Sequence, residues 1–155
     1  MQARMKEHPL NAEQINSLLD AVEVGHLATL GENGFPYVTP VHFVRMNGRV
    51  YFHGLAAGQK LKNLRADSRV CFEVTGPHQF IQADTPCDTN TAYQSVIITG
   101  HAAVVEDPAV KTAALDAVVG KYTPQHAGAA YPPNMLKMTA VVEITISEIT
   151  GKYYA

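Results

Sequence analysis

The chain has 155 residues, enough for one domain with a real core, and its 46% hydrophobic and 17% charged residues exclude a disordered protein. Twelve Lys and Arg against fourteen Asp and Glu give a net charge of -2, so there is no basic excess for general nucleic-acid binding or for docking on anionic membranes. We expect no secretory signal, because the first residues, MQARMKEHPLNAEQ, contain no apolar h-region, and no membrane helix, because no apolar run approaches the roughly 20 residues that a span needs. With two cysteines and no disulfide pattern, a cytoplasmic setting is expected.

A polar lead-in is expected over residues 1–10, followed by an amphipathic helix. Asn11 and Gln14 have the three-residue spacing of a capping box, and the next apolar residues recur at helical spacing, which predicts a helix over about 12–22. The later elements follow from alternation, turn residues and caps. Strands are expected at 26–30, 36–45, 49–54, 69–74, 93–105 (bent at Gly100) and 138–149, and helices at 59–66 and from Asp107-Pro108 to Gly120.

Asn47-Gly48 stands between two alternating apolar runs. This is the strongest short-range hairpin signal, because both central residues of a type I′ turn need a positive φ. Counting outward from that turn places His42 opposite His53 on one face of the sheet, with Cβ atoms about 4.5–5.5 Å apart. Pro40 lies in the first of the two strands and predicts an edge or a bulge there, because proline has no N–H.

Short strands joined by hairpins, followed by longer strands, predict a mainly β protein. We expect an antiparallel β-barrel of six or so strands with peripheral helices, in a single domain over residues 1–155. A Rossmann fold is disfavoured, because strands and helices do not alternate and no GxGxxG or Walker-type sequence is present. Two long loops are expected at 75–91 and 123–134, and the sequence leaves open whether they close over a site.

Lys60 stands at the predicted start of a short helix, after the small residues Ala56-Ala57-Gly58. A helix start offers free N–H groups and a dipole that favours an anion, Gly58 lets that anion approach the backbone, and lysine adds a point charge suited to a single phosphate group. The alternative is an ordinary solvated lysine on a helix surface. Its proximity to His53 favours the phosphate site.

The opposed His42 and His53 have three interpretations. They are structural residues satisfied by neighbours, metal ligands, or the wall of a pocket for a flat, phosphorylated ligand whose edge meets backbone amides of strand segment 40–43. No metal site is predicted, because the histidines lack HExxH or CxxC spacing, and His26 is expected on the face opposite His42 if the hairpin loop between them has an even length. The ligand pocket is favoured, since the proline of that strand leaves neighbouring amides free.

No catalytic nucleophile stands out. Cys71 lies in an apolar strand and is expected to be an inert core thiol, and Cys87 has no positive neighbour in sequence that would lower its pKa. Ser95 and Ser147 lie in strand patterns without a nucleophile elbow. A hydrolase is therefore not expected.

Several motifs follow one another in a specific order, although none is specific alone. They are GHLATL (25–30), FPYVTPVHFVR (35–45), NGRVYFHG (47–54), GQKLKNLRADSRVCFEV (58–74) and YQSVIITGHAAVVED (93–107). This order resembles the flavin-binding split-barrel family, which includes pyridoxamine 5'-phosphate oxidase and, closer in motif and length, the nitroimidazole-resistance-type flavoproteins. The resemblance covers nearly the whole chain, from Val24 to Lys152.

The resemblance implies a homodimeric split barrel with FMN at the subunit interface. It places the strand segment Pro40, Val41, His42 and Phe43 beside the flavin ring, through backbone as much as side-chain atoms. His53 and Gly54 are implied along the ribityl-phosphate arm, and Gln59 and Lys60 at the phosphate. Tyr93 and Ser95 are implied contacts from the second subunit.

The sequence also departs from the oxidase proper. That family has an arginine where Pro40 stands and ends in a signature with tryptophan and arginine, whereas this chain has no tryptophan, so pyridoxamine phosphate oxidase activity itself is not expected. The leading hypothesis is an FMN-dependent oxidoreductase that reduces a small, electron-poor organic molecule, with NAD(P)H as a candidate electron donor and His42 as a proton-donating residue. The alternatives are a flavin-binding protein without turnover and a haem-binding relative in which one of the two histidines ligates iron.

Overall fold

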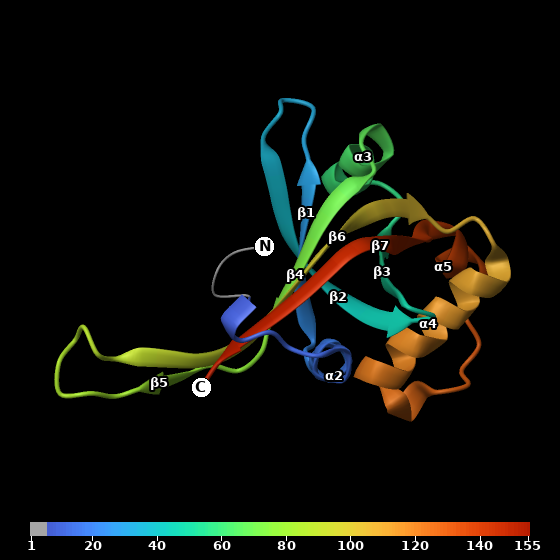
Figure 1. The fold of residues 1–155 in the computed structure, drawn as a ribbon. Coiled ribbons are helices and arrows are strands. Elements are labelled where there is room, and N and C mark those ends of the chain that lie inside the picture. The colour runs from blue at the N-terminus through green and yellow to red at the C-terminus, as the bar shows by residue number, and fades with distance from the viewer. Residues whose placement is uncertain (1–5) are drawn as a thin grey trace.

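The computed structural model describes residues 6–155, and its centre is an antiparallel sheet that curls into a ring, with helices around it (Figure 1). The strand order is β4-β1-β2-β3-β7-β6-β5, and an additional pairing of β4 with β6 closes the ring. The described part of the chain contains β1 (Val24–Leu30), β2 (Pro36–Met46), β3 (Arg49–Leu55), β4 (Arg69–Thr75), β5 (Gln79–Ile81), β6 (Asn90–Val104) and β7 (Thr139–Tyr154). The predicted antiparallel barrel is confirmed.

The helices lie outside the ring. They are α2 (Ala12–Ala21), α3 (Gln59–Ala66), α4 (Pro108–Tyr122) and α5 (Pro133–Met138), with a 3₁₀ turn η1 (Pro124–His126) between the last two. The predicted capping box is present, because the Asn11 side chain accepts from the Gln14 N–H and the Gln14 side chain accepts from the Asn11 N–H, both at 2.9 Å. The segment 123–134, predicted as a loop, instead contains η1 and the start of α5, each with a proline among its first residues, where the missing N–H is harmless.

The hairpin between β1 and β2 corrects one prediction. Leu30 pairs with Pro36, so the loop spans residues 31–35, an odd number, and His26 pairs with Pro40. Because directly opposed residues share a face, His26 lies on the same outer face as His42, and the prediction that they face opposite sides is wrong. The ladder has no bulge at Pro40.

Two further segments differ from the predictions. Residues 75–91 are not a plain loop, because β5 within them pairs with the start of β6 and forms a hairpin. Strand β7, predicted to end at residue 149, continues and pairs with β6 as far as Tyr154. Residues 1–5 of the predicted lead-in lie outside the described residues, but Leu10 is buried and its N–H donates to the Gly151 carbonyl at 3.0 Å.

The bend predicted at Gly100 is a register shift between Thr99 and Gly100 in the pairing of β6 with β7. A Cβ at this glycine would lie 2.1 Å from the carbonyl oxygen of Thr145, so no other residue fits without moving a strand. The shift lets the two longest strands bend around the ring.

Two apolar clusters hold the fold together. The larger fills the ring and includes Leu27, Phe43 and Phe72, all with 0% exposure. The smaller lies on the outer face, where α4 packs its Leu115 over Tyr51 and the neighbouring strands β2 and β7. Helix α4 therefore covers one part of the outer face and leaves the adjoining histidines at its edge.

Candidate functional site

His42 and His53 lie where β2 and β3 part. The two strands pair from Met46–Arg49 as far as Phe43–Phe52, which is the register predicted from Asn47-Gly48, and the histidines are the next pair outward. Beyond this point β2 pairs with β1, and β3 pairs with β7. Both histidines line one cavity of about 540 Å³, so they lie on the same side of the sheet, as the turn predicted, while their role as the wall of a flavin pocket stays a prediction.

This cavity lies between the outer face of the barrel and the covering segment from α4 to α5. Besides the two histidines, it is lined by Leu115, Val118, Val119, Tyr122, Thr123, Tyr131, Pro132, Met135, Leu136 and Thr139. No acidic, lysine or arginine side chain of the described residues lines it. The cavity therefore suits a largely apolar, flat group with a few hydrogen-bonding atoms.

Side-chain hydrogen bonds hold together the segment from α4 to α5 that covers the cavity. The Tyr131 hydroxyl donates to the Asp116 carboxylate at 2.7 Å, and burial together with this bond raises the pKa of Tyr131 to about 12. The Lys111 ammonium on α4 donates to the Leu136 carbonyl on α5 at 2.6 Å. Both tyrosines of the cavity remain protonated at neutral pH, because burial also raises the pKa of Tyr122.

Tyr122 is a site residue that the sequence reasoning missed. Its ring lies 4.9 Å from the His42 ring, and its hydroxyl accepts from the Phe43 N–H at 2.9 Å. The same hydroxyl lies 2.7 Å from the Phe43 carbonyl and 2.8 Å from the Glu23 carbonyl, to either of which it can donate. No local signal could have found it, since 79 residues separate it from Phe43.

This contact changes the roles expected of strand segment 40–43. The side chains of Val41 and Phe43 point into the core, with 6% and 0% exposure, and the Phe43 N–H is already bonded to Tyr122. Because backbone groups alternate between the two edges of a strand, Pro40 and His42 direct theirs toward the gap beside β3. Proline is tolerated there because no strand of the described chain pairs with that edge.

Lys60 and His53 lie close together. Burial lowers the pKa of His53, and the nearby charges of His42 and Lys60 lower it further, so its imidazole is neutral at pH 7. The Lys60 Nζ atom is 3.9 Å from the point where a Cβ on Gly54 would lie, so the bare backbone of that glycine leaves room for the ammonium. Among the described residues, no carboxylate forms an ion pair with Lys60.

Helix α3 begins without a side-chain cap. Its N-cap is Gly58, with φ 130°, and no side chain accepts from the first N–H groups of the helix. Gln59 turns its side chain the other way and donates to Asn63 at 2.7 Å, and Asn63 in turn donates to Thr29 at 3.0 Å inside the fold. Gln59 can therefore serve an anion at the helix start through its backbone N–H, while its side chain stabilises the buried network.

Tyr93 and Ser95 lie elsewhere on the chain. Tyr93 lines a different cavity, beside the β5 hairpin, and its ring lies 5.5 Å from the Lys152 ammonium. Ser95 is 9% exposed and pairs with Thr75 on β4. The structure does not bring them to His42 and His53 within one chain, and their expected role in a second subunit stays a prediction.

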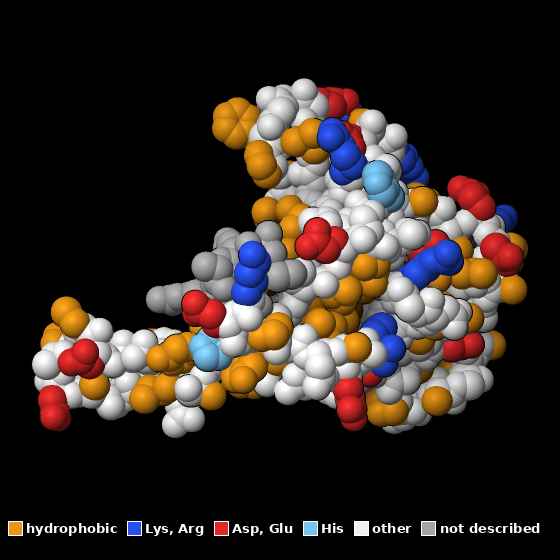
Figure 2. Space-filling model, viewed as in Figure 1, with side chains coloured by type: hydrophobic (Ala, Val, Ile, Leu, Met, Phe, Trp, Pro, Cys, Tyr) orange, Lys and Arg blue, Asp and Glu red, His pale blue; other side chains and the backbone are white. Residues whose placement is uncertain are grey.

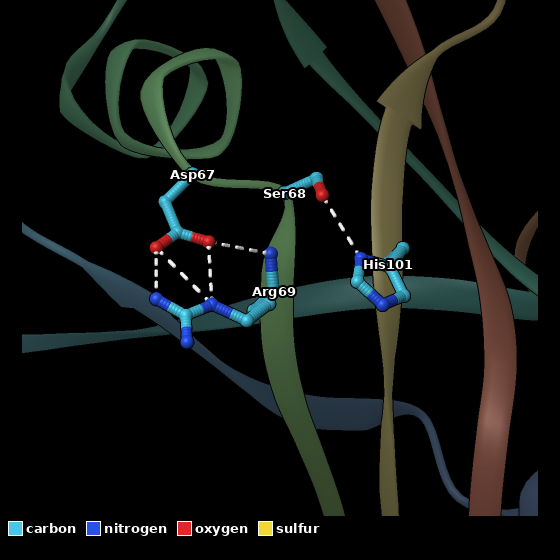
Figure 3. Close-up of polar contacts among 4 residues, drawn as sticks. All are labelled: Asp67, Ser68, Arg69 and His101. Carbon is cyan, nitrogen blue, oxygen red and sulfur yellow. Dashed lines mark hydrogen bonds and ion pairs between the residues drawn. The ribbon is translucent and has the colours of Figure 1, made fainter.

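A second polar cluster joins the end of α3 to β6 (Figure 3). The Asp67 carboxylate binds the Arg69 guanidinium, with Nη2 and Oδ2 2.5 Å apart, which lowers the pKa of Asp67 to about 2. Ser68 Oγ lies 2.9 Å from His101 Nδ1. This is not a Ser-His-Asp triad, because both oxygens of Asp67 bind Arg69 and neither forms a hydrogen bond with His101.

The remaining reactive groups are weak candidates. Cys71 lies half-buried on the outer face rather than in the core, and burial raises the pKa of its thiol, which makes it unreactive. The described residues contain no group of three or more His, Cys, Asp or Glu placed to hold a metal ion. In the same residues, no helix has the length and apolarity to cross a bilayer.

The comparisons with known proteins identify the family and the fold. The family model for pyridoxamine 5'-phosphate oxidase matches residues 11–153, and the chain belongs to this family. No curated protein sequence matches the chain.

Several solved structures share the fold. A protein of Bacteroides thetaiotaomicron described as a candidate 5-nitroimidazole antibiotic resistance protein is 23% identical, with a TM-score of 0.83 over 94% of this chain and 86% of that one. The flavocytochrome Anf3 of Azotobacter vinelandii is 29% identical, with a TM-score of 0.88 over 99% and 72%. A FAD and heme binding protein of Mycobacterium smegmatis is 22% identical, with a TM-score of 0.84 over 92% and 71%.

Proposed function

We propose that this protein is a flavin-dependent oxidoreductase that binds FMN at His42, His53 and the start of α3. The observation that carries the proposal is the Lys60 ammonium beside the uncapped start of α3, next to His53 and without a protein carboxylate among the described residues. A cation and free N–H groups directed to one point are what a phosphate monoester requires. The family membership and the flavin-binding relatives support the same assignment.

The residues present fit this cofactor, although the roles of individual residues differ from those expected from the sequence. Lys60 and the backbone N–H groups of α3 hold the phosphate, and the bare Gly54 leaves space for the ribityl arm. The ring edge meets the backbone of Pro40 and His42 at the open edge of β2. A bound flavin supplies the electron transfer, while His42 carries a proton near the substrate.

The substrate site is the cavity under α4 and α5. Its lining has no permanent charge, and the neutral imidazole of His53 supplies hydrogen bonds to a substrate, because the hydroxyl protons of Tyr122 and Tyr131 already have partners within the protein. A small, uncharged, electron-poor molecule such as a nitro compound or a quinone suits this lining. A phosphorylated substrate suits it less, because the lining contains no lysine or arginine to bind the phosphate. NAD(P)H is the proposed electron donor.

A second copy of the chain completes the site in this proposal. The outer face of β1 and β2 leaves apolar side chains uncovered, with Val24 at 40% exposure, Leu30 at 37% and Val38 at 58%. Exposed apolar faces of this kind support a homodimer with the flavin at its interface, to which Tyr93 and Ser95 of the second subunit contribute.

Haem is the second candidate ligand. Two histidines line the same apolar cavity of about 540 Å³, and two of the similar structures are named as haem proteins. A neutral His53 is the form that ligates iron. This reading places the iron at one of these histidines and the flavin along α3.

The visible spectrum of the purified protein separates these candidates. Flavin gives paired bands in the blue and near-ultraviolet, and haem gives one intense Soret band; mass spectrometry of the released cofactor distinguishes FMN from FAD. Anaerobic reduction by NADPH, followed by reoxidation with nitro compounds and quinones, tests for turnover. Flavin that is bound but not reoxidised by any acceptor would indicate a carrier. A colourless protein that takes up neither FMN nor FAD would refute the proposal.

A further inference from the structure

A second cavity adjoins the apolar cavity that contains the two histidines. Its volume is about 380 Å³, and it lies where the end of α3, the end of β6 and the helices α4 and α5 come together. The two cavities share Leu136 and Thr139 in their walls. They differ in charge, because the second is lined by three cationic side chains, Arg65, Lys111 and Lys137.

Each of these cations comes from a different helix. Arg65 lies on α3, Lys111 on α4 and Lys137 on α5. Lys111 is half-buried and donates to the Leu136 carbonyl at 2.6 Å, which leaves two of its three N–H donors for a ligand. The Arg65 guanidinium makes one long bond within the chain, to the Ala56 carbonyl at 3.4 Å, and keeps its other donors free for a ligand.

The protein does not neutralise this cluster. Among the described residues, none of the three cations forms an ion pair. The only carboxylate that lines the cavity in this part of the chain is Glu106, so three positive charges and one negative charge leave an excess of two positive charges. Like charges held together repel one another, and a bound anion would remove that cost.

The excess is local, because the whole chain has a net charge of -2. Most of the Lys and Arg side chains visible in Figure 2 lie over the part of the molecule that contains α3, α4 and α5, whereas the projecting β5 hairpin has none. Side chains rather than a helix start would bind the anion, since Asp107 already caps α4 and accepts from the Ala109 N–H at 2.8 Å. The cavity therefore suits an anion with more than one negative charge.

The shared wall indicates what the anion is attached to. A ligand that occupies both cavities has a flat, uncharged part beside the histidines and an anionic part at the three cations. Reduced nicotinamide dinucleotides have this form, because the dihydronicotinamide ring is uncharged and the pyrophosphate follows the adjoining ribose. The oxidised ring is cationic, and an unpaired charge is unfavourable in a cavity without charged groups, so the same arrangement favours release of the product.

We propose that Arg65, Lys111 and Lys137 bind the pyrophosphate of the nicotinamide dinucleotide that donates electrons, while its dihydronicotinamide ring occupies the apolar cavity. This assignment rests on the proposed function, because the ring must meet a bound flavin there. The electron donor and the uncharged acceptor then use the apolar cavity in turn. NADH and NADPH both contain the pyrophosphate, so the cations serve both.

Steady-state reduction of a quinone by the flavin-loaded protein tests the assignment. The double variant Arg65→Gln, Lys137→Gln removes two exposed cations and keeps Lys111, whose bond to Leu136 holds α5 to α4. The matched control, Lys6→Gln with Lys62→Gln, removes the same charge from exposed positions outside the cavity. We expect the KM for NADH and for NADPH to rise about tenfold in the double variant and to stay within about twofold in the control.

A donor without phosphate provides a second comparison. 1-Benzyl-1,4-dihydronicotinamide has the same ring and no phosphate, so its KM should be equal in the wild type and the double variant. An equal rise with this donor, or an unchanged KM for NADH, would overturn the assignment. A rise with NADPH alone would also overturn it, because the cations would then bind the 2′-phosphate. Loss of flavin from the double variant alone would overturn it as well, because the cations would then hold the flavin's own phosphate.

Binding without turnover separates this assignment from the proposed function. ADP-ribose contains the pyrophosphate and no nicotinamide, and calorimetric titration should show it binding at least about tenfold more tightly than inorganic phosphate, with about tenfold weaker binding in the double variant. Equal affinities for the two ligands would overturn the assignment. A protein without flavin that binds ADP-ribose through these cations refutes the proposed function and leaves the pyrophosphate site intact. A flavoprotein that NADPH reduces with the same KM in all three proteins refutes the pyrophosphate site and leaves the proposed function intact.

Discussion

Replacing Lys60 by alanine removes the ammonium group beside Gly54 and His53 at the start of α3. A hydrogen bond to a charged group contributes about 1.5–3 kcal/mol, which corresponds to a loss of FMN affinity of about ten- to 150-fold. Binding is weakened rather than abolished, because the free N–H groups of α3 remain. Folding stability should fall by no more than about 1 kcal/mol, since Lys60 loses no ion pair among the described residues and only a contact with the Phe52 ring, whose centre lies 5.8 Å from the ammonium.

Quenching of flavin fluorescence during titration of the apoprotein measures this affinity. Lys62→Ala is the matched control, because it removes the same charge from the same helix but breaks an exposed pair with Glu32. Riboflavin is the second control, since it lacks the phosphate and its affinity should not depend on Lys60. If Lys60→Ala weakens FMN no more than Lys62→Ala does, or weakens riboflavin equally, Lys60 does not hold the phosphate.

Three other substitutions test the packing and electrostatics around the site. Tyr122→Phe leaves the Phe43 N–H without its partner and should lower the free energy of unfolding in urea by about 1–3 kcal/mol; an unchanged midpoint would show that the bond is dispensable. Gly100→Ala introduces a Cβ 2.1 Å from the Thr145 carbonyl oxygen and should destabilise the fold by about 1–3 kcal/mol or more, seen as a lower thermal midpoint, and wild-type stability would contradict the close approach. Because the pKa of His53 is lower in the folded state, the unfolded chain binds more protons, and stability should fall as the pH drops through the unfolded value of about 6.5. His53→Gln should flatten this dependence between pH 7.5 and 5.5 in denaturant titrations, and an identical slope in both proteins would rule out His53 as its source.

The sequence by itself determined the features that depend on neighbouring residues. Asn47 and Gly48 have φ angles of 53° and 70°, as their turn requires, and this turn alone placed His42 opposite His53. The start of α3 after Gly58, with Lys60 in its first turn, was also predicted from a few neighbouring residues. These predictions hold because turn chemistry and capping act over a few residues.

Only the tertiary structure decided which distant groups meet at those residues. The face of the sheet on which His26 lies depends on whether the loop between β1 and β2 has an odd or an even number of residues. The composition of that loop does not reveal which. Tyr122 reaches His42 and Phe43 because α4 packs across the barrel, and the cavity exists because α4 and α5 are fastened over the gap. Such contacts arise from the packing of complete elements, so the histidine pair was predictable from its hairpin, but its surroundings were not.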